Sequence, residues 1–116
     1  MYNSVVLIAI NVTDDKLYKL LKKAKVRKTS RVEILSAGIN EGADVAWCIS
    51  HEETTLIRFF TDKPPVDTVV HELLHAAIHI LRYVGIPLTS SSEEAYTYLL
   101  DNLVGRYYKF FKSPKN

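Results

Sequence analysis

Two histidines spaced four residues apart are the most chemically suggestive feature of this chain. His71 and His75 bracket a segment that reads HELLH, which has the form HExxH. On an α-helix, residues i and i+4 lie one turn apart on the same side, so both imidazoles can hold one metal ion. Glu72, next to the first histidine, would lie near enough to a metal-bound water to take its proton. The spacing therefore predicts a zinc site that activates water.

The segment around this motif has the periodicity of a helix that begins near Val66 and ends near Val84, before Gly85 and Pro87. At about 100° per residue, one stripe of this helix is polar. Its members are His71, Glu72, His75, His79 and Arg82. A helix that is apolar elsewhere should be largely buried, so the stripe is predicted to face a cleft or an interior in which its polar groups have partners. The alternative is a solvated stripe with incidental histidines.

A catalytic zinc site needs a third protein ligand. The metzincin extension requires glycine and histidine where this chain has Ile78 and Leu81, so that extension is absent. The next predicted helix offers Glu93 and Glu94 instead. Glu94 shares its helical face with Tyr98, whereas Glu93 lies about 100° away, so we predict Glu94 as the ligand and keep Glu93 as the alternative. Either acid can also act only on the helix dipole.

From Asp67 to Gly105 the chain resembles the gluzincin metallopeptidases. The resemblance is carried by HELLHAAIHILRYVGIP, a short serine-rich loop and EEAYTYLLDNL. It is strongest to the minimal single-domain minigluzincins and to related small phage or prophage zincin-like proteins. The resemblance implies a zincin-like α+β fold, with a small twisted mixed sheet, an N-terminal helix, an HExxH helix and a C-terminal helix that donates a glutamate.

The resemblance also implies roles for individual residues. His71, His75 and Glu94 become zinc ligands and Glu72 the general base. The family's glutamate precedes an alanine-aromatic pair, as Glu94 does here, which supports that choice. Thermolysin-like enzymes carry an acidic residue one turn after this ligand, where the present chain has Tyr98.

Other residues are candidates for supporting roles. Asp101, on the same helical face as Glu94, could orient a ligand histidine. The tetrahedral oxyanion of peptide hydrolysis needs a hydrogen-bond donor beside the metal. Tyr98 and His79 join the predicted catalytic set for this purpose, with Tyr96 and Arg82 as further candidates. Tyrosines at helical spacing are more often core or rim, and His79 more often belongs to the stripe without binding metal.

The elements that must position these residues follow from the hydrophobic pattern. We predict strands at Val5–Ile10, Arg31–Ala37, Asp44–Ser50 and Thr54–Thr61, and helices at Asp14–Ala24, 66–84 and Ser92–Phe111. Thr13 is the predicted N-cap of the first helix. Gly38, Asn40 and Gly42 mark a turn, and the last two strands form a hairpin with His51 at its exposed tip. Residues 1–116 are predicted to form one α+β domain.

Composition narrows the class of protein. A net charge of +2 gives no reason to expect nucleic-acid binding. The single cysteine, Cys48, rules out an intrachain disulfide framework and is expected in the core. No stretch has the length of a membrane span or the pattern of a signal peptide, so a cytoplasmic protein is expected. Four aromatic residues near the C-terminus are predicted to pack against the sheet: Tyr107, Tyr108, Phe110 and Phe111.

These observations predict a zinc metallopeptidase that binds a peptide or protein substrate as an extended strand on one strand of the hairpin. The sequence does not determine which of the two strands pairs with the substrate. The alternatives are a zinc-binding regulatory module with little or no turnover and a peptidase dedicated to one partner protein of a phage or mobile element. A purely structural small domain is the last alternative. The sequence leaves the oligomeric state open.

Overall fold

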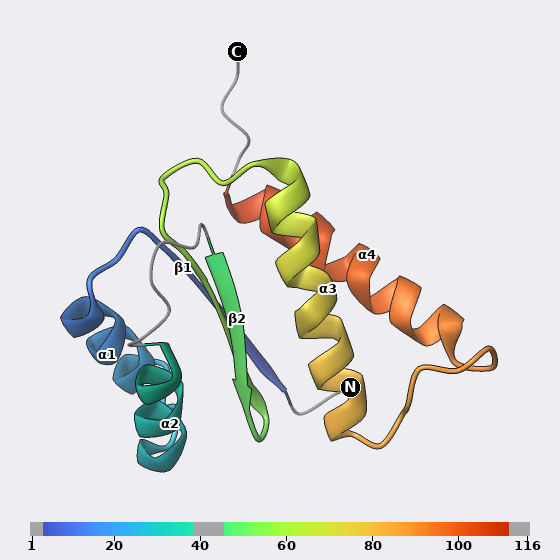
Figure 1. Cartoon of the computed structure of the whole chain (residues 1–116), viewed down its shortest axis with the longest axis horizontal. Coiled ribbons are helices and arrows are strands. Elements are labelled where there is room, and N and C mark those ends of the chain that lie inside the picture. The colour runs from blue at the N-terminus through green and yellow to red at the C-terminus, as the bar shows by residue number, and fades with distance from the viewer. Residues whose placement is uncertain (1–3, 39–45, 112–116) are drawn as a thin grey trace.

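The computed structural model describes residues 4–38 and 46–111, and for residues 35–38 only the backbone (Figure 1). Its elements, in chain order, are β1 (Val5–Ile10), α1 (Asp14–Lys23), α2 (Lys28–Gly38), β2 (Ala46–His51), β3 (Thr54–Phe59), α3 (Val66–Tyr83) and α4 (Glu93–Phe110). The predicted α+β class and the hairpin of β2 and β3 are confirmed. No helix in these two ranges is long and apolar enough to cross a membrane.

The sheet of the described chain has three strands in the order β1-β3-β2. β1 runs parallel to β3, with Val5 opposite Thr54 and Ile10 opposite Phe59, whereas β2 runs antiparallel to β3. Every residue of β3 is buried, because this strand has a neighbour on each side and helices on both faces. β1 and β2 are therefore the two edges of a mixed sheet.

Alternate residues of the strands supply two hydrophobic clusters, one on each face of the sheet. Leu56 belongs to the cluster that holds Leu17 and Leu21 of α1 and Ile34 of α2. Ile57 and Phe59 belong to the other cluster, which α3 and α4 complete with Val69, Leu73, Ala76 and Tyr107. Figure 1 shows the resulting layers, with α1 and α2 on one side of the strands and α3 and α4 on the other.

The predicted strand Arg31–Ala37 is wrong, because this segment lies in α2. Val32 and Ile34 alternate with polar residues over too short a run to separate strand from helix. The buried positions of α2 lie four residues apart instead: Ile34 packs in the cluster with α1, and buried Ser30 is hydrogen-bonded to His51 of β2. Gly38 ends the helix, while Asn40, Gly42 and Asp44 lie outside the described residues.

The ends of α1 and α3 follow local rules. The Thr13 hydroxyl accepts a hydrogen bond from the Lys16 amide at 3.2 Å, which confirms the predicted N-cap. At the end of α3, Gly85 has φ +89°, and the Ile86 amide donates to the Leu81 carbonyl. This turn sets the direction in which the chain leaves α3 toward α4.

Tyrosines hold α4 in place. The Tyr96 hydroxyl donates a 2.5 Å hydrogen bond to the Ile86 carbonyl in the turn after α3. At the other end of α4, the ring of buried Tyr107 lies edge-on to Phe59, with 6.0 Å between centroids. The predicted packing of the C-terminal aromatics is thus confirmed for Tyr107 and wrong for Phe110, which is 79% exposed.

Candidate metal centre

The two histidines of the HExxH motif lie together on the outer face of α3. Their ring centroids are 4.8 Å apart and the ring planes are inclined by 77°. Both side chains are exposed, on the side of the helix that faces away from the core. Two imidazoles one turn apart can bind the same ion, so the pair fits the histidine half of a zinc site.

The apolar residues of α3 dictate this orientation. Successive positions at a spacing of three or four face the sheet and are almost fully buried: Val69, Leu73, Ala76 and Ile80. Ala76 and Ala77 have small side chains, which lets α3 pack closely on β2 and β3. With this stripe turned inward, His71 and His75 are necessarily turned outward.

Glu72 occupies a different environment from the histidines that flank it in the motif. It is 7% exposed and lies toward β2. Burial raises the pKa of the Cys48 thiol on β2 to about 12, and the nearby charge of Glu72 adds to the effect. The predicted polar stripe is therefore divided: the carboxylate lies between α3 and β2, about 100° around the helix from the exposed His71.

His79 continues the histidine row by one more turn and is half-buried. Burial lowers its pKa, and the charges of His75 and Arg82 lower it further. Tyr98, the other predicted oxyanion donor, is 70% exposed on α4 and lines a groove beside β1. The structure thus brings His79 into line with His71 and His75 but places Tyr98 on another surface.

The predicted carboxylate ligands lie in the first turn of α4, and both are exposed. In residues 4–38 and 46–111, no three side chains of His, Cys, Asp or Glu converge as a metal site. The face of α4 that packs inward is formed by Tyr96, Leu100, Leu103, Val104 and Tyr107. At 100° per residue, Glu93 lies roughly 40° and Glu94 roughly 140° from the centre of that face. The histidine pair is formed, and the third ligand is not gathered with it.

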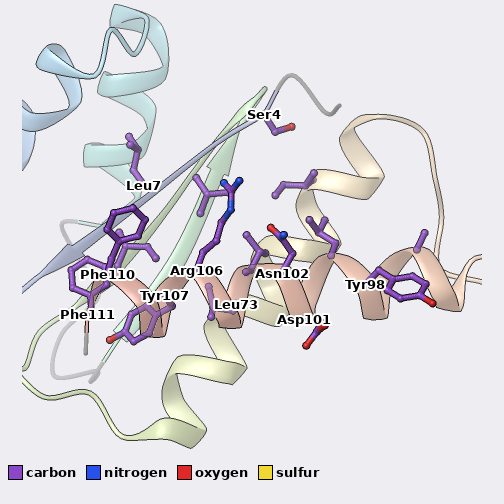
Figure 2. Close-up of a pocket in the computed structure, with 16 residues that line it drawn as sticks. Ser4, Leu7, Leu73, Tyr98, Asp101, Asn102, Arg106, Tyr107, Phe110 and Phe111 are labelled. Atoms are coloured by element: carbon purple, nitrogen blue, oxygen red, sulfur yellow. The ribbon is translucent and has the colours of Figure 1, made fainter. Parts of the chain in front are cut away.

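Asp101, predicted as a support for a ligand histidine, is exposed on α4. Figure 2 shows its carboxylate turned away from β1, on the opposite side of α4 from Asn102. No histidine of the described chain makes a hydrogen bond to it.

The structure also identifies the strand of the hairpin that has a free edge near the motif. β3 is paired on both sides, whereas β2 is an edge strand of the described sheet and contacts α3. The sequence could not separate the two strands, because a hairpin pattern looks the same whichever strand finds a second partner. The sequence also could not predict that Cys48 and Glu72 lie near each other, since this depends on how α3 crosses β2.

Comparison with known proteins finds no family model, no curated protein and no solved structure that matches this chain.

Proposed function

We propose that this protein is a zinc-dependent metallopeptidase whose ion is held by His71 and His75. The observation that carries the proposal is the pair of imidazoles 4.8 Å apart, with the motif's glutamate next to the first of them in the same helix. When bound, zinc would polarise a peptide carbonyl and lower the pKa of a coordinated water. Glu94 is the proposed third ligand and Glu93 its alternative.

The residues of the chain itself supply the rest of the proposed chemistry. Glu72 takes a proton from the attacking water and later delivers it to the leaving amine. Its buried position between α3 and β2 keeps bulk water away from the carboxylate. An extended substrate would pair with the free edge of β2, which lies beside Glu72. His79 remains a proposed donor to the oxyanion because it continues the same row.

Metal content is the first test of this proposal. Wild type and the variants His75→Ala, Glu93→Ala and Glu94→Ala would be loaded with zinc, dialysed and measured by elemental analysis. We expect about one zinc per chain in wild type, loss in His75→Ala, and weaker retention in one glutamate variant. No zinc in wild type after loading would refute the metal site and with it the peptidase.

Peptidase activity is tested separately with an extended, unstructured substrate such as casein. Glu72→Gln should retain zinc and lose roughly 100-fold to 10,000-fold in turnover, because a general base contributes about that much. Glu53→Gln is a matched control, since Glu53 lies in the β2–β3 turn beside Arg27, away from the motif. Equal turnover in wild type and Glu72→Gln would exclude Glu72 as the base.

A zinc-binding module without turnover is the second candidate. The observation that favours it is the absence of a gathered third ligand in the described chain. Stoichiometric zinc with no hydrolysis of casein, together with unchanged zinc retention in Glu72→Gln, would select this candidate. We also propose a cytoplasmic location, which suits the free thiol of Cys48.

A further inference from the structure

The sheet of the described chain is narrower than the helix layer that covers one of its faces. Neighbouring strands lie about 4.8 Å apart, so three strands and their edges span roughly 14 Å. Two helices side by side, each about 10 Å wide, span roughly 20 Å. α3 packs on β2 and β3, and α4 packs mainly on α3, with Tyr107 of α4 also in contact with Phe59 of β3. The layer therefore has width for about one more strand beside β1.

A groove occupies this place. It has a volume of about 1130 Å³ and lies between β1, one side of α4 and the inner face of α3. Its apolar walls include Val6 and Ile8 of β1, Leu73 of α3 and Leu99 and Leu103 of α4. Figure 2 shows α4 lying across one end of the strands, with side chains rising from it toward β1.

β1 has the composition of a strand with two neighbours. All six of its residues are apolar, and it contains no charge, proline or bulge. Natural edge strands usually carry such features, because a bare edge pairs with any available strand. Within the described ranges β1 pairs only with β3, and Val5 is 40% exposed. The unpaired amides and carbonyls of β1 therefore offer a template beside the groove.

Polar groups in the groove specify the charge of the occupant. Arg106 extends from α4 toward β1, with Asn102 one turn earlier on the same side (Figure 2). Arg106 forms no ion pair with any residue of the described chain. The Ser4 hydroxyl, in the groove wall just before β1, is buried and has no hydrogen-bond partner among the described residues. Asp101 also lines the groove, but its carboxylate is turned away from β1 (Figure 2). The groups that face β1 are therefore a cation, an amide and a hydroxyl, which favour a carboxylate.

We propose that this groove binds an extended peptide segment as a fourth strand on β1, with a glutamate or aspartate side chain paired to Arg106. Alternate apolar side chains of the segment would fill the space between Val6, Ile8 and α4, because strand side chains alternate between faces. A second copy of the chain fits less well, since two-fold pairing of β1 strands would bring two Arg106 side chains into the shared groove. The site lies at the opposite edge of the sheet from β2, so it does not depend on the zinc proposal.

The probe is a fluorescein-labelled nine-residue peptide of alternating valine and threonine with one central glutamate, compared with the same peptide carrying glutamine. Binding is followed by fluorescence anisotropy on the full chain. We expect the glutamate peptide to bind up to about fivefold more tightly, because Arg106 is exposed and an exposed charge pair is worth at most about 1 kcal/mol. Arg106→Gln should abolish the difference. Arg106→Glu should instead prefer a lysine peptide, while Lys109→Gln, outside the groove lining, should behave as wild type.

Circular dichroism of each variant verifies that the exposed substitutions leave the fold intact. Equal affinity for the glutamate and glutamine peptides, or a preference that survives Arg106→Gln in a folded protein, would overturn the proposal. So would a glutamate peptide that binds unchanged after N-methylation of alternate backbone amides, because strand pairing needs those donors. Sedimentation of wild type as a dimer that Val6→Lys dissociates would assign the groove to a second copy and equally overturn it.

Discussion

The reactivity of Cys48 tests the contact between α3 and β2 on which the proposed site depends. Cys48 is the only cysteine, so every alkylation event reports on this position. Burial and the charge of Glu72 raise the pKa of its thiol from 9.0 to about 12. At pH 8 a three-unit rise lowers the thiolate fraction by about 1000-fold. Because nucleophilicity rises with pKa (Brønsted slope about 0.45), the expected net slowing is roughly 50-fold before steric protection.

The assay is alkylation by iodoacetamide, followed by mass spectrometry between pH 7 and 10. At pH 8 the native chain should react at least about 50-fold more slowly than the same chain unfolded in urea, where the thiol has its ordinary pKa, and the difference should shrink toward pH 10. Glu72→Gln removes the smaller of the two causes, so the thiol pKa should fall but stay above its ordinary value. Glu93→Gln, on the exposed first turn of α4, is the matched control and should have no effect.

Two results would refute this reasoning. A native Cys48 that alkylates as fast as the unfolded chain would show that β2 does not bury the thiol against α3. Slow alkylation that Glu72→Gln leaves unchanged at every pH would show that burial alone protects Cys48. Glu72 would then lie elsewhere, and its proposed place beside the edge of β2 would be lost.

The remaining predictions concern the stability of the fold. Leu73→Ala should lower the free energy of unfolding by about 2–5 kcal/mol in urea titrations, because Leu73 is fully buried between α3 and the sheet. Asp14→Asn should cost at most about 1 kcal/mol, because Asp14 is 67% exposed in its 2.6 Å ion pair with Arg58. Arg58→Ala should lower the free energy of unfolding by more, about 2–4 kcal/mol, since Arg58 is 8% exposed and also donates to the Val12 carbonyl. Equal losses for Asp14→Asn and Arg58→Ala would contradict this prediction. Burial lowers the pKa of His79 below its ordinary value, so the unfolded chain takes up the proton at a higher pH than the folded chain, and the free energy of unfolding should fall as the pH drops below about 6.5. His79→Gln should reduce this dependence on pH. An unchanged dependence would exclude His79 as its source.

The elements with long or strongly marked patterns were predictable from the sequence. The helix of α3 repeats its apolar residues over five turns, and Thr13 marks the start of α1 by a local hydrogen bond. The strand prediction for Arg31–Ala37 was wrong because tertiary contacts, and not the local sequence, determine that this segment is helical. Ile34 is buried only because α1 and β2 present an apolar surface to it, and the pattern within the seven residues of Arg31–Ala37 does not contain that information.

Part of the candidate site could likewise be predicted from local sequence, and part depends on tertiary packing. The pairing of His71 with His75 is a property of helical geometry, so the spacing alone predicted it. The separation of Glu72 from the exposed histidines depends on which side of α3 the sheet covers. The groove beside β1 was not foreseen, because its existence depends on a difference in width between two layers. The one available signal is the uncharged composition of β1, which predicts a buried strand but not what lies beside it.

Glu93 and Glu94 would require different rotations of α4 to reach a metal ion bound by His71 and His75, and an experiment can distinguish the two rotations. Bringing Glu94 to face α3 requires a roll of roughly 140° about the axis of α4, whereas Glu93 needs roughly 40°. A large roll would break the hydrogen bond from Tyr96 to the Ile86 carbonyl, which is worth about 1 kcal/mol.

Tyr96→Phe removes that hydrogen bond and keeps the ring. If zinc binds a conformation in which α4 has rolled to present Glu94, this variant should bind zinc about fivefold more tightly. The reason is that the unrolled conformation, which does not bind zinc, has lost about 1 kcal/mol of stability. If Glu93 is the ligand and α4 keeps its contacts, Tyr96→Phe should leave zinc affinity unchanged or weaken it. Competition titration with a chromogenic chelator measures the affinity. A tighter Tyr96→Phe together with an inert Glu94→Ala would contradict both alternatives, and the third ligand would then be neither of these glutamates.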